Sequence, residues 1–135
     1  MCSVITVGCV TTIGNKHKNR NTPCEDASFA ATVNGVSVVC IADGAGGKQY
    51  TDARFGSACA VETISSVLCE HFDALYAENC DAAVRGYLMA KLRVEFAKIM
   101  QERSLDVIDR LSCTLLFAAV KDRRMMIGHI GDGLI

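Results

Sequence analysis

Short apolar runs typical of β-strands lie toward both ends of the chain. Two of them, residues 27–33 and 36–42, are separated only by Asn34-Gly35. An Asn-Gly pair between such runs is typical of a type I′ turn, because that turn requires positive φ at both central positions. The pattern therefore predicts a β-hairpin over residues 27–42.

The middle of the chain has a helical pattern instead. A first helix is predicted to begin after Asp52, the candidate N-cap, and a second from about Asp81. Their apolar residues recur at roughly helical spacing: Phe55, Cys59, Ile64, Val67, Leu68 and Phe72 in the first helix, and Val84, Leu88, Leu92, Phe96 and Ile99 in the second. Each helix therefore has one apolar face to bury against another element.

Three further runs are predicted to be strands. Residues 3–12 are rich in Val, Ile and Thr, and residues 114–120 and 125–130 flank a charged turn at 121–124. No internal repeat or linker divides the chain, so residues 1–135 are interpreted as one unit. Antiparallel strands with helices segregated against them predict an α+β layered domain.

The composition supports a folded domain and excludes several classes of partner. Of the 135 residues, 50% are hydrophobic and 21% are charged, which is enough apolar material for a core. The net charge of −1, with both signs interspersed, provides no basic field for a nucleic-acid backbone or an anionic membrane. The N-terminus lacks a signal-peptide pattern, and no stretch approaches the ~18 apolar residues of a membrane span. A cytoplasmic protein without nucleic-acid or membrane partners is expected.

The eight cysteines are interpreted as reduced residues that bind no metal. Five lie in apolar segments without regular spacing, which favours a place in the core: Cys9, Cys40, Cys59, Cys69 and Cys113. The chain has no Cys-x-x-Cys pair, and its three histidines are far apart, so the ligand spacing of structural zinc is missing. Cys24 is disfavoured as a nucleophile toward an anionic substrate, because the neighbouring Glu25 carboxylate would repel the substrate.

Candidate chemistry lies where an apolar run opens into residues 42–47, Ala-Asp-Gly-Ala-Gly-Gly. A carboxylate such as Asp43, placed after a buried strand and beside flexible glycines, can bind a hard cation together with backbone carbonyls. The same residues are typical of an ordinary strand-ending turn. A phosphate-binding P-loop is disfavoured by its spacing, since positions 42 and 49 would have to be Gly and Ser or Thr but are Ala and Gln.

Two more acidic segments stand at the ends of predicted strands. Glu25-Asp26 precedes the hairpin, and Asp132 follows the last strand between two glycines. Taken singly, each is typical of a solvated turn. If the strand ends converge, the carboxylates would repel one another unless a cation compensates them, and oxygen-only ligands favour Mg²⁺ or Mn²⁺ over zinc.

Five parts of the chain share their order and spacing with a known family: residues 14–26, 42–47, 50–52 with 56–58, 112–115 and 129–133. They resemble successive motifs of the metal-dependent type 2C protein phosphatases, the PPM family. The resemblance covers nearly the whole chain but only about the N-terminal half of that family's catalytic domain. It implies a four-layer α-β-β-α sandwich, of which the chain would supply the first part.

The resemblance also implies roles for individual residues. Asp43 would bridge two metal ions, Mg²⁺ or Mn²⁺, and Gly44 would offer its backbone carbonyl to one of them. Glu25 and Asp26 would hold metal-bound waters or ligate at the margin, and Asp132 matches an aspartate associated with a third, weaker metal. Two further aspartates of the family's metal pair would lie beyond residue 135.

The implied chemistry is hydrolysis of phosphoserine or phosphothreonine esters in a phosphoprotein, by a metal-activated water that attacks phosphorus in line. Many family members carry a phosphate-binding arginine where this chain has Asn21, so Arg20, His17 or Lys18 would take that role. The alternatives are a non-catalytic binding or regulatory module with the same fold, and a small oligomerisation domain in which Asp43 is only a turn residue. Half of a sandwich would also expose sheet edges that invite self-association.

Overall fold

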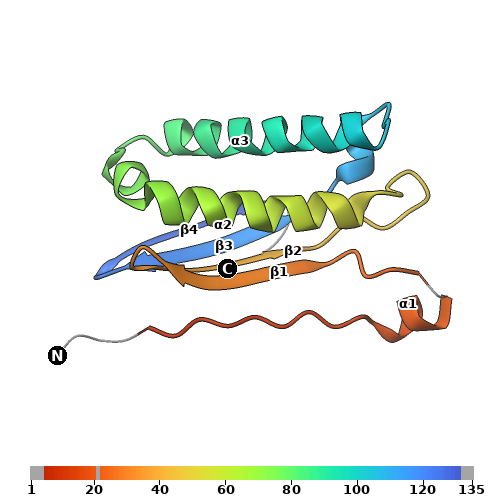
Figure 1. Ribbon diagram of the computed structural model, residues 1–135, viewed down its shortest axis with the longest axis horizontal. Helices are drawn as coiled ribbons and strands as arrows, with labels where there is room; N and C mark the ends of the chain where they lie inside the picture. The colour runs from red at the N-terminus through yellow and green to blue at the C-terminus, as the bar shows by residue number, and fades with distance from the viewer. Residues whose placement is uncertain (1–4, 21, 132–135) are drawn as a thin grey trace.

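The computed structural model of the protein describes residues 5–20 and 22–131, with the side chains of residues 16, 17 and 20 excepted. Figure 1 shows helices on one side of a sheet and an extended N-terminal segment on the other side. In chain order the elements are α1 (Asn15–Arg20), β1 (Ala27–Val33), β2 (Val36–Ala42), α2 (Ala53–Ala77), α3 (Asp81–Glu102), the 3₁₀ helix η1 (Ile108–Leu111), β3 (Leu115–Lys121) and β4 (Arg124–Ile130).

The four strands form one antiparallel sheet in the order β1-β2-β3-β4. The predicted hairpin is confirmed, with Ala27 paired to Ala42 and with Asn34 and Gly35 at φ 54° and 75° in its turn. The predicted C-terminal hairpin is confirmed as well, because β3 and β4 pair around a tight turn in which Asp122 has φ 56°. Asn and Asp tolerate this left-handed conformation better than most residues.

Both long helices lie on one face of the sheet (Figure 1). α2 packs against β1, β2 and β3, and α3 packs against α2. Since successive side chains of a strand point to opposite faces, every second residue of each strand is directed at the helices. The buried core includes Val36, Val38, Cys40, Ile64, Leu68, Phe72, Leu88, Leu92, Leu115, Phe117 and Ala119. The two predicted helices and the segregation that makes the domain α+β are therefore confirmed.

The other face of the sheet, which we call the outer face, is apolar but only partly covered. Ile41, Met125 and Ile127 on this face are 47%, 59% and 53% exposed. Residues 5–14 run along this side in extended form (Figure 1), and the Thr11 and Ser28 hydroxyls share a hydrogen bond. The described residues thus form a single sheet with helices on one face, which is compatible with part of the four-layer sandwich.

Two sequence-based expectations differ from the structure, and two short elements were missed. The strand predicted over residues 3–12 is not formed by its described part, residues 5–12, because a strand requires a neighbour that pairs with its backbone. The short elements α1 and η1 were not predicted. Cys9 is exposed, because it lies in that unpaired segment, whereas Cys40 and Cys69 are buried and Cys59 and Cys113 are half-buried.

All seven described cysteines are free thiols, as the sequence predicted, and Cys2 lies outside the described residues. None of the described helices combines the length and the apolar composition needed to cross a lipid bilayer.

Candidate metal centre

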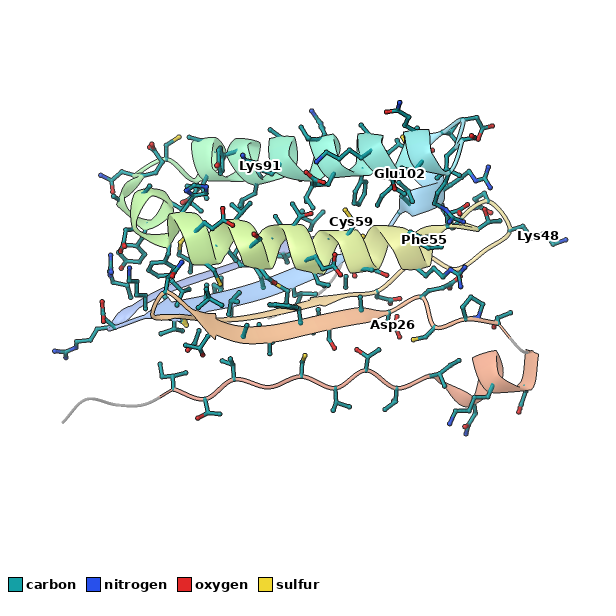
Figure 2. The ribbon with its side chains drawn as sticks, viewed as in Figure 1. Asp26, Lys48, Phe55, Cys59, Lys91 and Glu102 are labelled. Carbon is teal, nitrogen blue, oxygen red and sulfur yellow. The ribbon has the colours of Figure 1, made fainter. Side chains whose placement is uncertain are left out.

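One end of the sheet brings together the acidic segments that the sequence singled out. The β1–β2 register pairs Ala27 with Ala42, so one step further along the strands it places Asp26 opposite Asp43. The β2–β3 register, continued in the same way, places Asp43 opposite Thr114. Three neighbouring strand ends therefore present these residues in one row, and Figure 2 shows Asp26 at the start of β1.

Backbone hydrogen bonds hold this end of the sheet beyond the regular strands. The Gly44 amide donates to the Glu25 carbonyl at 3.1 Å. On the other side, the Ala45 amide donates to the Ser112 carbonyl at 2.9 Å, and the Thr114 amide donates to the Asp43 carbonyl at 2.8 Å. The loop that carries Asp43 is thus held on both sides by backbone hydrogen bonds.

Gly44 is buried and lies close to Glu25, just beyond the ends of β2 and β1. A Cβ atom added to Gly44 would lie 2.5 Å from the Glu25 carbonyl oxygen and 2.9 Å from the Glu25 Cβ. Because the first of these atoms belongs to the backbone, the space cannot be opened by turning a side chain. The glycine is therefore required by packing at this position.

The alternation of side chains divides the predicted site residues between the two faces. Asp26 and Asp43 are exposed and follow the outer face, together with Thr114. They line one cavity of about 300 Å³, whose other walls include Thr11 and Ser28. Glu25, by contrast, begins on the helix-facing side, since its Cβ lies near the buried Gly44. The structure brings the two aspartates to one cavity and starts Glu25 on the opposite face.

The N-terminal half of α2 holds these strand ends from the helix side. The fully buried Ser57 donates a hydrogen bond from its hydroxyl to the Glu25 carbonyl. One residue earlier, a Cβ added to Gly56 would lie 1.9 Å from the Leu111 carbonyl oxygen of η1. The helix therefore contacts both the segment before β1 and the segment before β3.

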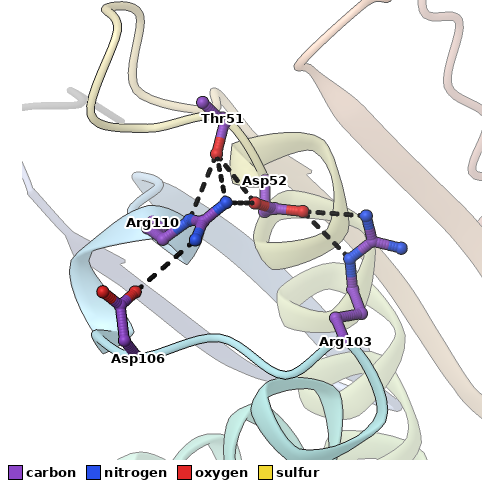
Figure 3. A network of polar contacts seen from close by, with 5 residues as sticks. All are labelled: Thr51, Asp52, Arg103, Asp106 and Arg110. Carbon is purple, nitrogen blue, oxygen red and sulfur yellow. Dashed lines mark hydrogen bonds and ion pairs between the residues drawn. The ribbon is translucent and has the colours of Figure 1, made fainter.

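A second acidic residue of the same loop has an entirely different environment. Asp52 stands at the N-cap position of α2, as the sequence suggested, but its side chain makes no capping hydrogen bond. Its carboxylate oxygens instead lie 2.9 Å from Arg103 Nη2 and 3.0 Å from Arg110 Nη2 (Figure 3). The Thr51 hydroxyl donates to the same carboxylate at 2.8 Å and accepts from Arg110.

This network joins the start of α2 to η1 and to the end of α3. Asp52 is only 4% exposed, and the guanidinium of Arg103 lies 3.6 Å from the ring centroid of Phe55. The Thr51 hydrogen bond, then the bond and charge of Arg103 and the charge of Arg110, lower the pKa of the Asp52 carboxyl, although burial acts in the opposite direction. The carboxylate is therefore ionised at neutral pH and neutralised within the fold.

The cysteines near the site are not set up as nucleophiles. Cys24 Sγ lies 3.8 Å from Asp26 Oδ2, beside a carboxylate that would repel phosphate. Burial, followed by the neighbouring Cys59 and Asp43, raises the pKa of the Cys113 thiol to about 11. Since the thiolate is the reactive form of cysteine, Cys113 is unreactive at neutral pH.

The donors around the cavity are suited to a hard cation. Its polar walls are carboxylates and hydroxyls, and no cysteine or histidine lines it. Mg²⁺ is commonly held in proteins by one or two carboxylates and several waters, whereas structural zinc takes four protein ligands. Among the described residues there is no cluster of three or more His, Cys, Asp or Glu side chains that could hold a metal. The residues present therefore fit Mg²⁺ or Mn²⁺ with a partly water-filled ligand shell.

Other predicted site residues lie at or beyond the limits of the described chain. Asp132 is outside the described residues, although the β3–β4 register places the preceding Gly131 opposite Thr114. The backbones of His17 and Arg20 belong to α1, and their side chains are not described. Sequence reasoning did not assign a role to Thr114 or Ser57, although both lie in segments that it had marked as motifs.

Comparison with known proteins identifies one family. A family model described as Protein phosphatase 2C matches residues 13–135. No curated protein and no solved structure gives a significant match to the chain.

Proposed function

The chain belongs to the protein phosphatase 2C family, and on this premise we propose that it serves the metal-dependent hydrolysis of phosphoserine and phosphothreonine esters. The observation that carries the proposal is the cavity shared by Asp26 and Asp43. Two carboxylates on adjacent strand ends are suitable ligands for Mg²⁺ or Mn²⁺ in an enzyme that acts on phosphate.

In this proposal the chain supplies one side of the metal site. Asp43 and the backbone carbonyl of Gly44 hold the cation, Asp26 and Glu25 bind at its margin, and Asp132 serves a third, weaker metal. When bound there, divalent metal activates a water for attack on phosphorus and neutralises the phosphoryl oxygens. The backbone hydrogen bonds on both sides of Asp43 hold the loop that carries its carboxylate, so that little ordering of the backbone is required when the cation binds.

The basic residues of α1 are proposed to receive the phosphate. Arg20, His17 and Lys18 belong to this helix, which lies at the same end of the molecule as the loop after β2 (Figure 1). Arginine is well suited to the role, because its planar guanidinium forms two parallel hydrogen bonds with phosphate.

A second sheet is proposed to cover the outer face and to complete the four-layer sandwich. The exposed Ile41, Met125 and Ile127 support this arrangement, because contiguous apolar surface of this kind is typical of a packing interface. Such a sheet would also enclose the cavity that contains Asp26 and Asp43.

The test is release of phosphate from a phosphothreonine peptide in the presence and absence of Mn²⁺. It is run on the 135-residue chain and on a form continued past Ile135, because the family's two remaining metal-ligating aspartates are expected there. We expect Mn²⁺ binding by both forms and hydrolysis by the longer form alone. Asp43→Asn should lower the rate more than about 100-fold, beyond the usual cost of losing an outer-shell partner of a metal.

The matched control is Asp73→Asn, which removes an exposed carboxylate that is paired with Lys121 and Arg124. It should leave the rate unchanged. Hydrolysis that persists without divalent metal, or in Asp43→Asn, would contradict the proposal. Metal binding without hydrolysis in the longer form would favour the alternative, a non-catalytic module with the phosphatase fold.

A further inference from the structure

Thr114 is the cross-strand neighbour of Asp43 at the candidate metal site. It is half-buried, follows the outer face of the sheet and lines the same cavity as Asp26 and Asp43. Its backbone amide donates to the Asp43 carbonyl at 2.8 Å. Its hydroxyl oxygen accepts a hydrogen bond from the Asp43 amide at 3.3 Å. Thr114 therefore binds both backbone groups of the predicted ligand.

This arrangement departs from a regular antiparallel ladder. Gly44 and Cys113 are paired next to Asp43 and Thr114. The backbone hydrogen bonds of this pair are made by the residues on either side of it, from Ala45 to Ser112 and from Thr114 to Asp43. In a regular ladder the next pair, Asp43 and Thr114, would exchange two bonds between backbone groups alone. Here the Asp43 amide donates to the Thr114 hydroxyl, whereas in a regular ladder it would donate to the Thr114 carbonyl. One of the hydrogen bonds that hold the Asp43 backbone is thus made by a side chain.

The methyl group of Thr114 is directed toward Gly131 at the end of the neighbouring strand. Gly131 has φ +93°, and a Cβ added to it would lie 2.9 Å from the Thr114 methyl carbon, Cγ2. The methyl group therefore packs against the glycine, while the hydroxyl faces Asp43. Threonine is β-branched, so fixing its methyl group also fixes its hydroxyl.

We propose that Thr114 is a positioning residue for the metal ligand: its hydroxyl holds the Asp43 backbone so that the carboxylate is directed into the cavity. The inference rests on the proposed function in taking Asp43 as the ligand. It goes further in assigning the orientation of that ligand to one hydroxyl on the neighbouring strand. Outer-shell hydrogen bonds of this kind typically contribute 10–100-fold to metal affinity.

The test compares Thr114→Val with Thr114→Ser in the 135-residue chain. Valine keeps the branched shape and the contact with Gly131 but has no acceptor, whereas serine keeps the hydroxyl. Mn²⁺ affinity is measured by calorimetric titration, and exchange of the Asp43 amide hydrogen is measured by NMR without metal. We expect Thr114→Val to weaken Mn²⁺ binding about tenfold and to speed exchange about fivefold, and Thr114→Ser to restore most of both.

Thr32→Val is the matched control, because it removes a hydroxyl that bonds Ser37 at 2.9 Å across the distant end of the β1–β2 hairpin. It should alter neither readout. Unchanged affinity and unchanged Asp43 exchange in Thr114→Val would overturn the inference. A wild-type chain that binds no Mn²⁺ would instead contradict the proposed function, and the exchange measurement would still decide whether the hydroxyl holds Asp43.

Discussion

Asp43 and Asp52 flank the same loop, but their carboxylates have opposite environments. Asp52 is 4% exposed and lies between two arginines and a threonine hydroxyl (Figure 3). Asp43 is exposed, and it lines a cavity with a second carboxylate, Asp26. The difference separates two uses of an acidic side chain. One carboxylate is compensated inside the fold and stabilises it, while the other faces a cavity that a ligand can enter.

The largest effect on stability should come from Asp52→Asn. This change leaves Arg103 and Arg110 without their shared anion, and removing one partner of a buried ion pair typically costs about 3–5 kcal/mol. We expect the free energy of unfolding in urea to fall by about 3 kcal/mol. This value is at the lower end of that range because both arginines are about one-third exposed.

Asp43→Asn should leave the free energy of unfolding within about 0.5 kcal/mol of the wild-type value, because surface substitutions usually have effects of this size. Equal losses in the two variants would mean that Asp43 is a structural residue like Asp52, and the comparison would fail.

A second substitution tests the close packing of α2 against η1 near Asp52. Gly56→Ala brings a Cβ to 1.9 Å from the Leu111 carbonyl oxygen, so α2 and η1 must move apart. We expect a loss of about 2 kcal/mol in thermal or urea unfolding, as is typical of overpacking. Gly86→Ala is the control, since nothing lies within 4 Å of its added Cβ and alanine favours a helix by about 0.5–1 kcal/mol. Similar losses in both variants would show that α2 and η1 are not closely packed.

A smaller effect is expected from Arg103→Lys. The lysine keeps the positive charge near Asp52 but loses one of the two hydrogen bonds to Oδ1 and the guanidinium contact with the Phe55 ring. The loss should be about 1 kcal/mol, which is typical of a cation–π contact at a partly exposed site. An unchanged unfolding midpoint would indicate that only the net charge around Asp52 matters.

The smallest expected effect is a change with pH in the stability difference between wild type and Asp52→Asn. The pKa of Asp52 is lowered in the folded state, so its contribution is present above the unfolded value of about 3.9 and is lost as the pH falls through the folded pKa. The stability difference between wild type and Asp52→Asn should therefore be constant from about pH 7 to 5 and narrow below about pH 3.9. A difference that narrows already near neutral pH would contradict the lowered pKa.

Much of the fold followed from local signals in the sequence. Asn34-Gly35 predicted the first hairpin, because a turn with two positive φ values has few alternatives. The apolar spacing from Phe55 to Phe72 predicted α2 for a similar reason, since only a helix brings those positions to one face. The segment before the hairpin was assigned wrongly, because its β-type composition does not reveal whether a partner strand exists.

The candidate site was predictable to a similar degree. The acids at strand ends were recognised because Glu25-Asp26, Asp43 and Asp132 each stand next to a predicted strand, and converging carboxylates favour a hard cation. The environments of those acids were not predictable, since they depend on residues distant in sequence. Asp52 was interpreted as a helix cap, whereas its partners Arg103 and Arg110 lie in a different part of the chain. The hydrogen bond between Thr114 and Asp43 likewise depends on the strand register.

The most direct test of the difference between the two acidic positions is the location of Mn²⁺ on the protein. A paramagnetic ion broadens the NMR signals of nearby backbone amides, so a titration followed residue by residue identifies the carboxylates that bind it. We predict broadening of the Asp26, Asp43 and Thr114 amides, which disappears in Asp43→Asn and is retained in Asp73→Asn. Broadening that survives in Asp43→Asn, or that centres on another part of the chain, would contradict the account.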